Sequence, residues 1–238
     1  MNDSTQLPLD RPIWSALTTR QAHLRHGDRL ACRYFPDVAP FAAMSPEPGE
    51  TAANWHALHD LLQADEAVSL LSLDALDPID ALQAERIGML HQMIAPRPLN
   101  ETVDDQDVIH LTGRDAPAMF DLAQTTKPGP FGQRTHQMGH YIGIRDGGRL
   151  IAMAGERMQL DGFVEISAVC VDADYRGKGL AGRLVNVLRK QIGQRGDIPF
   201  LHVFSANQAA ITLYERLGFE QRQAFVLTRV KRADSAPG

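Results

Sequence analysis

The sequence contains only two cysteines in 238 residues, Cys32 and Cys170, and neither belongs to a CxxC motif. Two isolated cysteines make neither a disulfide framework nor a cysteine-based metal site, so we expect a protein of a reducing compartment, the cytoplasm. Long apolar runs are also missing, and none approaches the ~20 residues that a membrane-spanning helix needs. The polar N-terminus, MNDSTQLPLDRP, lacks the apolar core of a signal peptide.

An excess of positive charge is missing as well, because the formal net charge is −5. This balance gives no support to a nucleic-acid or anionic-membrane partner. The histidines His110, His136 and His140 lack metal-ligand spacing with a carboxylate, so we predict no metal. The composition does supply 44% apolar and 22% charged residues. That is ample for a packed core, in one large domain or two smaller ones.

Hydrophobic periodicity predicts helices and strands along most of the chain. We interpret residues 1–12 as a flexible tail, and a proline-rich break at 95–100 as a domain boundary. This boundary separates an N-terminal α/β domain at 13–100 from a C-terminal domain at 101–238. From Val108 onward the predicted order is β-α-β-β-β-α-β-α-β. The expected helices are 13–26, 52–63, 115–124, 180–192 and 207–217, and the expected strands are 29–34, 68–73, 87–94, 108–111, 140–145, 150–158, 163–171, 200–204 and 225–230.

The most informative stretch is EISAVCVDADYRGKGLAG, residues 165–182. An apolar, β-branched run stops at Asp172, a glycine-rich turn follows at 176–179, and a helix begins. Unpaired N–H groups of a first helical turn and the helix dipole favour an anion there. Glycine allows close approach, and Arg176 and Lys178 add positive charge. The pattern predicts a phosphate-binding turn, but it matches neither a GxGxxG fingerprint nor a GxxxxGK[ST] loop.

The run Val169–Ala181 resembles the acetyl-coenzyme A signature of the GNAT N-acetyltransferases, which places Arg or Gln, two residues, Gly, one residue, then Gly or Ala. Arg176, Gly179 and Ala181 meet it. A second signature follows in NQAA (207–210) and LYERLGF (213–219). The resemblance covers about 108–230 and implies an α/β (α+β) acyl-CoA N-acyltransferase fold, a mixed, mostly antiparallel sheet flanked by helices. The smaller α/β domain before it could be a degenerate copy, without a second glycine signature and therefore without a cofactor.

The resemblance also implies roles for individual residues. The backbone of Val169 and Val171 would pair with the pantetheine arm, and the N–H groups of 176–181 would hold the pyrophosphate. Tyr214 would lie near the thioester sulfur and donate a proton to the leaving thiolate. The implied cofactor-binding residues are Val169, Cys170, Val171, Arg176, Gly177, Lys178, Gly179, Leu180, Ala181, Asn207, Ala210 and Tyr214.

A proton must also leave the acceptor amine, and Glu165 is the first candidate for the base. We expect partial burial to raise the pKa of this carboxyl, although it could simply face solvent. His202 and Glu156 are rivals. Cys170 has no base beside it, so we expect a buried structural thiol. In the loop 125–134, Phe131 and Arg134 are candidates for acceptor specificity, or else surface residues without a ligand.

These features predict an acetyl-CoA-dependent N-acetyltransferase in which a primary amine attacks the thioester directly. Acetyl-CoA would be a co-substrate, no metal would take part, and the acceptor would be a small-molecule or peptide amine. Two alternatives remain open: a non-catalytic acetyl-CoA sensor or scaffold, and an acyltransferase for longer acyl chains. The acceptor could be a protein N-terminus, a polyamine, an amino acid or an aminoglycoside, and the oligomeric state is also open.

Overall fold

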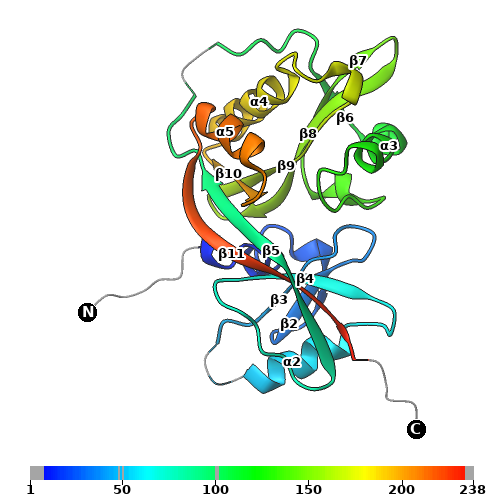
Figure 1. Cartoon of the computed structure of the whole chain (residues 1–238), viewed down its shortest axis with the longest axis vertical. Coiled ribbons are helices and arrows are strands. Elements are labelled where there is room, and N and C mark those ends of the chain that lie inside the picture. The colour runs from blue at the N-terminus through cyan, green and yellow to red at the C-terminus, as the bar shows by residue number, and fades with distance from the viewer. Residues whose placement is uncertain (1–7, 48, 50, 100–101, 234–238) are drawn as a thin grey trace.

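The computed structural model describes residues 8–47, 49, 51–99 and 102–233. Within these residues the strands form an eight-stranded sheet in the order β4-β11-β5-β10-β9-β8-β7-β6 and a three-stranded sheet, β1-β2-β3 (Figure 1). In the same part of the chain, no helix is long and apolar enough to cross a membrane.

From Val108 onward the elements follow the order expected from the sequence, and that order is confirmed. The strands are β1 Arg25–Gly27, β2 Ala31–Tyr34, β3 Ala42–Met44, β4 Ala67–Ser72, β5 Leu82–Ile94, β6 Ile109–Leu111, β7 Tyr141–Asp146, β8 Arg149–Leu160, β9 Phe163–Val171, β10 Ile198–Phe204 and β11 Glu220–Arg232. The helices are α1 Pro12–Thr18, α2 Thr51–Asp60, α3 Ala116–Thr126, α4 Leu180–Gln194 and α5 Gln208–Arg216, with short 3-10 turns η1 Pro8–Asp10, η2 Ala22–Leu24, η3 Gly113–Asp115, η4 Thr135–Met138 and η5 Ala173–Tyr175.

The N-terminal segment differs from its prediction in three places, one of which is the strand β3, where none was expected. The helix expected over 13–26 ends at Thr18, and η2 and β1 follow. The hydroxyls of Thr18 and Thr19 bond back to the carbonyls of Trp14 and Ser15, a bonding pattern that competes with helix continuation. Residues 8–12, expected in a flexible tail, form η1 and the start of α1 because Leu9 is buried at 2% exposure. Residues 1–7 lie outside the described residues.

Strand β5 joins the two ends of the chain into one sheet. It lies between β10 and β11 and pairs antiparallel with both, while β4 pairs with β11. The boundary expected near residue 100 therefore falls between β5 and β6, two strands of the same sheet. The division into a 13–100 and a 101–238 domain stays a prediction, but the two segments share a hydrogen-bonded ladder.

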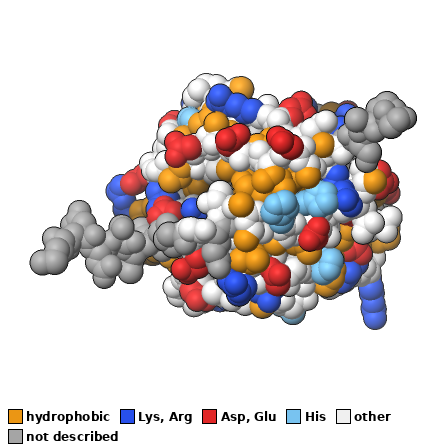
Figure 2. All heavy atoms as spheres, turned by 90° about the horizontal axis from the view of Figure 1, so that it is seen from below, with side chains coloured by type: hydrophobic (Ala, Val, Ile, Leu, Met, Phe, Trp, Pro, Cys, Tyr) orange, Lys and Arg blue, Asp and Glu red, His pale blue; other side chains and the backbone are white. Residues whose placement is uncertain are grey.

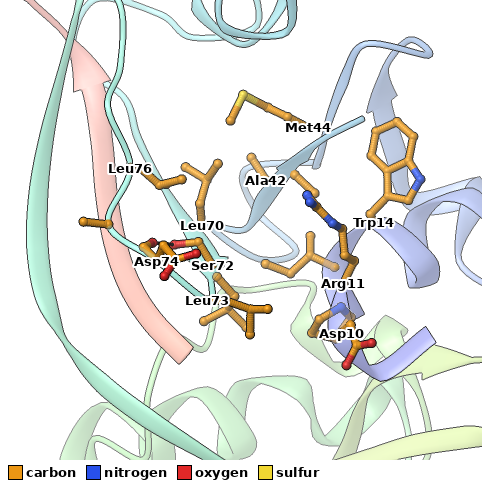
Figure 3. Close-up of a pocket in the computed structure, with 15 residues that line it drawn as sticks. Asp10, Arg11, Trp14, Ala42, Met44, Leu70, Ser72, Leu73, Asp74 and Leu76 are labelled. Atoms are coloured by element: carbon orange, nitrogen blue, oxygen red, sulfur yellow. Dashed lines mark hydrogen bonds between the residues drawn. The ribbon is translucent and has the colours of Figure 1, made fainter. Parts of the chain in front are cut away.

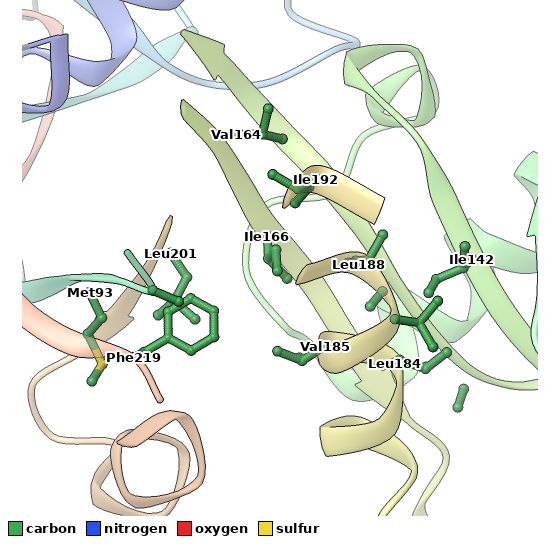
Figure 4. Packing of buried hydrophobic residues seen from close by; sticks show 14 of the residues in the cluster. Met93, Ile142, Val164, Ile166, Leu184, Val185, Leu188, Ile192, Leu201 and Phe219 are labelled. Carbon is green, nitrogen blue, oxygen red and sulfur yellow. The ribbon is translucent and has the colours of Figure 1, made fainter. Parts of the chain in front are cut away.

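The large sheet is mixed and mostly antiparallel, as expected. Its only parallel neighbours among the described strands are β9 and β10. Helix α4 covers one face, where Leu184, Leu188 and Ile192 pack on Val164 and Ile166 (Figure 4). Each such buried side chain stabilises the fold by roughly 1.5–3 kcal/mol. Helix α3 covers the other face through a separate cluster that includes Met119 and Cys170.

The N-terminal segment covers the part of the α3 face that α3 leaves open. Leu17, Tyr34 and Phe41 pack there with Met158 and Phe200 of the large sheet. This segment therefore covers the end of β8, the start of β9 and the part of β10 around Phe200. Seen from below, charged and histidine side chains surround a band of apolar side chains on the lower face of the molecule (Figure 2).

Candidate active site

The site begins where the parallel strands β9 and β10 separate. Their ladder contains three pairs and ends with Phe200 opposite Glu165. Beyond this point β10 keeps its pairing with β5, whereas the edge of β9 from Ile166 to Val171 has no ladder to β10 among the described strands. Backbone N–H and C=O groups need hydrogen-bond partners. This edge can therefore pair with an extended chain that carries amides.

A β-bulge lies in the unpaired part of β9. The register with β8 shifts between Met153 and Gly155, and Ala168 takes a φ of 52° in the left-handed region. Residues other than glycine rarely adopt this backbone conformation, which is found preferentially at functional sites. The bulge directs Val169 and Val171 to the α4 cluster, while Cys170 packs in the α3 cluster.

The glycine-rich turn follows β9 and leads into α4. Asp172 accepts a hydrogen bond from the Asp174 N–H at 3.0 Å and starts the turn. Gly177 and Gly179 have φ values of 77° and 75°, and no atom lies within 4 Å of an added Cβ at either position. Glycine is therefore needed here for the backbone conformation. Gly179 is the N-cap of α4, so the first N–H groups of the helix point out of the turn.

The basic side chains near this turn divide into two groups. Those on α4 and at its C-cap have partners: Arg183 pairs with Asp104 and Asp107, Lys190 with Asp105, and the C-cap residue Arg195 with Glu156. Arg176 and Lys178 have no carboxylate partner in the described part of the chain. Arg176 contacts the carbonyl of Val171, and the Lys178 ammonium lies 4.6 Å from the centre of the Tyr175 ring. Their positive charge is therefore available to an anion at the turn.

Helix α5 faces the same region from the other side of the divergence. The Asn207 side-chain oxygen accepts from the Ala210 N–H at 3.2 Å and caps the helix, so its amide N–H groups remain as donors. Ala210 and Tyr214 are half-buried against the cluster that contains Val169. Burial raises the pKa of Tyr214 to about 12. The phenol therefore stays protonated near neutral pH and can act as a proton donor.

The environment of Glu165 differs from the one expected for a general base. Its side chain is 0% exposed and forms a two-point ion pair with Arg157 at 2.6 and 2.8 Å. Burial opposes the charge, but the attraction of Arg157 and the hydrogen bonds from Arg157 and His202 outweigh it and lower the pKa of Glu165 to about 2. The expectation of a raised pKa is wrong, because the sequence did not reveal the buried arginine.

The rival His202 belongs to the same buried network. Its Nδ1 lies 2.7 Å from the Glu165 carboxylate, and the side chain is 1% exposed. Its Nε2 lies 3.3 Å from the amide nitrogen of Gln92, whose oxygen accepts from Arg222 at 2.9 Å. Arg222 also pairs with Asp10. Glu165 and His202 thus tie β9 to β10 at the point where these strands separate.

The remaining candidates also have structural partners. Glu156 is buried at 1% exposure and pairs with Arg195. Arg134 pairs with Asp37 at 3.2 Å, and Phe131 packs edge-on against Tyr141. Cys170 is buried, and burial raises the pKa of its thiol to about 11, which confirms the buried thiol. In the described part of the chain no group of three or more His, Cys, Asp or Glu side chains could hold a metal.

Sequence reasoning missed three features of this region. Arg157 is the partner of Glu165, and its position in the second half of a mostly apolar strand, MAGERMQL, next to Glu156, was a usable signal. Tyr141 is 2% exposed, and its hydroxyl is buried without a hydrogen-bond partner. Nothing in the sequence indicated the bulge at Ala168, because alanine does not favour a positive φ.

Comparison with known proteins links this geometry to a family. The family model "FR47-like protein" matches residues 141–228, which contain β7 to β10 and the first part of β11. An Escherichia coli protein, "[Ribosomal protein bS18]-alanine N-acetyltransferase", is 31% identical over 113 residues, or 45% of this chain and 76% of the relative. The Mycobacterium tuberculosis "N-alpha-acetyltransferase RimI" is 36% identical over 85 residues. That match spans 34% of this chain and about half, 52%, of the relative's length.

A solved structure matches nearly the whole chain, including the N-terminal segment. It is a protein from Novosphingobium aromaticivorans, assigned to the acetyltransferases of the GNAT family, and it is 36% identical with a TM-score of 0.88. The match covers 96% of this chain and 100% of the other chain.

Proposed function

The chain belongs to the GNAT family of N-acetyltransferases, and we propose that it transfers an acetyl group from acetyl-coenzyme A to a primary amine. The observation that carries the proposal is the unpaired edge of β9, which runs from the point of strand separation to the glycine-rich turn. An extended, amide-bearing arm along this edge would place its phosphates at one end and its thioester at the other.

The turn provides the phosphate end. The N–H groups of 176–181 and the charges of Arg176 and Lys178 would hold the pyrophosphate, since neither side chain is committed to a carboxylate among the described residues. Val169 and Val171 would pair through their backbones with the pantetheine amides. Cys170 contributes backbone only, because its side chain is buried in the opposite face. Asn207 would donate from its free amide N–H groups.

The reaction forms one N–C bond and breaks one C–S bond. The amine nitrogen attacks the thioester carbonyl carbon, and the electron pair of the C–S bond passes to sulfur. Tyr214 donates its proton to that sulfur, which accounts for a phenol held protonated by burial. The amine loses its proton to water, because Glu165, His202 and Glu156 are buried and already bonded.

Glu165 is then a positioning residue. It bonds Arg157 and His202 beside the last β9–β10 pair and so sets where the two strands separate. This assignment replaces the role of base expected from the sequence. A cytoplasmic location stays a prediction.

One observation favours the alternative of a non-catalytic acetyl-CoA sensor: none of the three proposed proton acceptors is both exposed and unpaired. The sensor would bind acetyl-CoA at the same residues and would turn over no amine. The experiment described next also compares acetyl-CoA with longer acyl-CoA thioesters as the acyl donor.

The experiment measures thiol release from acetyl-CoA with a panel of amines: a peptide with N-terminal alanine, a polyamine, an amino acid and an aminoglycoside. The peptide is included because of the activity named for the E. coli relative. Amine-dependent thiol release and acetylated product support the proposal. Saturable acetyl-CoA binding without release from any amine favours the sensor, and faster release from octanoyl-CoA favours a longer-chain acyltransferase.

A further inference from the structure

The two halves of the chain have the same sequence of pairings. Strands β1-β2-β3 form an antiparallel meander, and so do β7-β8-β9. Each meander is followed by a helix, α2 or α4, and by a strand parallel to the meander's third strand, β4 or β10. Each half ends in a 13-residue strand, β5 or β11, which pairs with the short strand of the other half.

The N-terminal half therefore has its own pair of separating parallel strands. Strand β4 meets the start of β3 at a single parallel bridge, Phe41 with Ser69, next to the hydrogen bond from the Ser69 N–H to the Pro40 carbonyl. Beyond this bridge no ladder joins β3 to β4 within the described residues. This gap corresponds to the separation of β9 and β10 in the other half.

A pocket of about 340 Å³ occupies this gap (Figure 3). Its walls are β3, β4 with the residues that follow it, and the beginning of α1. Apolar side chains, including Met44, Leu70 and Trp14, line part of it, and polar atoms contribute an equal share of its surface. This volume is within the range of small-ligand sites.

The chemistry of the pocket excludes a second coenzyme A. The chain between β3 and α2 reads SPEPGE and contains no lysine or arginine, so nothing there would neutralise a pyrophosphate. Two charges line opposite walls instead: Arg11 beside α1 and Asp74 after β4 (Figure 3). Neither side chain forms an ion pair within the described residues. The remaining carboxylate, Asp10, is already paired with Arg222.

We propose that this pocket binds a short linear peptide of two or three residues with free termini and apolar side chains. Its ammonium group pairs with Asp74 and its carboxylate with Arg11. Its amides pair with the free edges of β3 and β4, as an added strand does. An extended tripeptide spans about 10 Å, which corresponds to the three residues of β3. This binding goes beyond acetyl transfer and does not depend on it.

The test uses trivaline with free termini, titrated by calorimetry against the full chain without acetyl-CoA. Asp74→Asn should weaken trivaline binding about two- to fivefold, the size of an exposed ion pair. The same variant should not change the affinity for N-acetyl-trivaline, which has no ammonium group. Arg11→Gln should weaken trivaline in the same way but leave trivaline amide unchanged.

Matched controls are Asp77→Asn and Arg229→Gln, two exposed residues outside the pocket lining, which should bind trivaline like the wild type. Trp14 provides a second readout, since trivaline should change its fluorescence. Three outcomes would overturn the proposal: no binding at millimolar trivaline, equal weakening of trivaline and N-acetyl-trivaline by Asp74→Asn, or displacement of trivaline by coenzyme A. A lack of acetyl transfer in the amine panel would leave all these expectations unchanged.

Discussion

Replacing Glu165 by glutamine removes the negative charge from the buried network at the strand divergence while keeping the size of the side chain. Arg157 would then lie buried at 11% exposure without its ionic partner, and His202 would lose its charged acceptor. We expect Glu165→Gln to lower the free energy of unfolding strongly at neutral pH.

Two independent arguments give a similar size for this loss of unfolding free energy. Removing one partner of a buried ion pair costs about 3–5 kcal/mol. Independently, lowering the pKa of Glu165 from 4.5 to about 2 corresponds to on the order of 3 kcal/mol of stability. A loss of about 3 kcal/mol is a large part of the stability of a typical domain.

Urea unfolding at pH 7 measures this loss, with Glu220→Gln as the control. Glu220 also pairs with an arginine, Arg97, but the two side chains are 52% and 83% exposed. Exposed pairs contribute about 0–1 kcal/mol. The two variants therefore remove the same charge from similar ion pairs and differ in burial.

The pH dependence has a definite sign. Because the pKa of Glu165 is lower in the folded state, its contribution is complete above the unfolded value of 4.5 and is lost as the pH falls toward about 2. The difference between wild type and Glu165→Gln should therefore shrink between pH 4.5 and pH 2. A Glu165→Gln protein within about 1 kcal/mol of wild type at pH 7, with no such narrowing, would refute the reasoning. Lost turnover in such a stable variant would restore the role of base.

Four further changes test other parts of the structure. Tyr214→Phe should lower kcat about a hundredfold, as expected for loss of a general acid, while equilibrium binding of coenzyme A stays nearly unchanged; unaltered kcat would remove the assignment. Replacing both Arg176 and Lys178 by alanine should weaken coenzyme A binding at least about tenfold in low salt and less in high salt, whereas Arg97→Ala should not. Gly155→Ala should cost about 1–3 kcal/mol because the new Cβ would lie 2.2 Å from the Tyr141 ring. Gly193→Ala, in α4 with no atom within 4 Å, should gain about 0.5–1 kcal/mol in the same unfolding assay.

Local patterns were sufficient to predict the C-terminal fold. The alternation of β7, β8 and β9, the helical spacing of α4 and α5, and the glycines of the turn all act over a few residues. The glycine-rich turn could be predicted for the same reason, because the strand, Gly177, Gly179 and the helix follow one another directly in the sequence.

Contacts between distant segments could not be predicted in this way. The pairing of β5 with β10 and β11 joins residues more than a hundred positions apart, and a period-two pattern does not specify the partner strand. The ion pair of Glu165 depends on Arg157 and on the N-terminal segment that covers both. A carboxyl that looked half-exposed in one strand is therefore fully buried in the folded chain.

The position of β11 has a consequence for synthesis on the ribosome. Among the described strands it is synthesised after all the others, yet it lies between β4 and β5, which end at Ser72 and Ile94. Until it arrives, both earlier strands expose edges that can pair with other chains. The sheet edges of β4 and β5 therefore stay unpaired until β11 has been made, and we expect nascent chains that stop before Glu220 to be prone to aggregation.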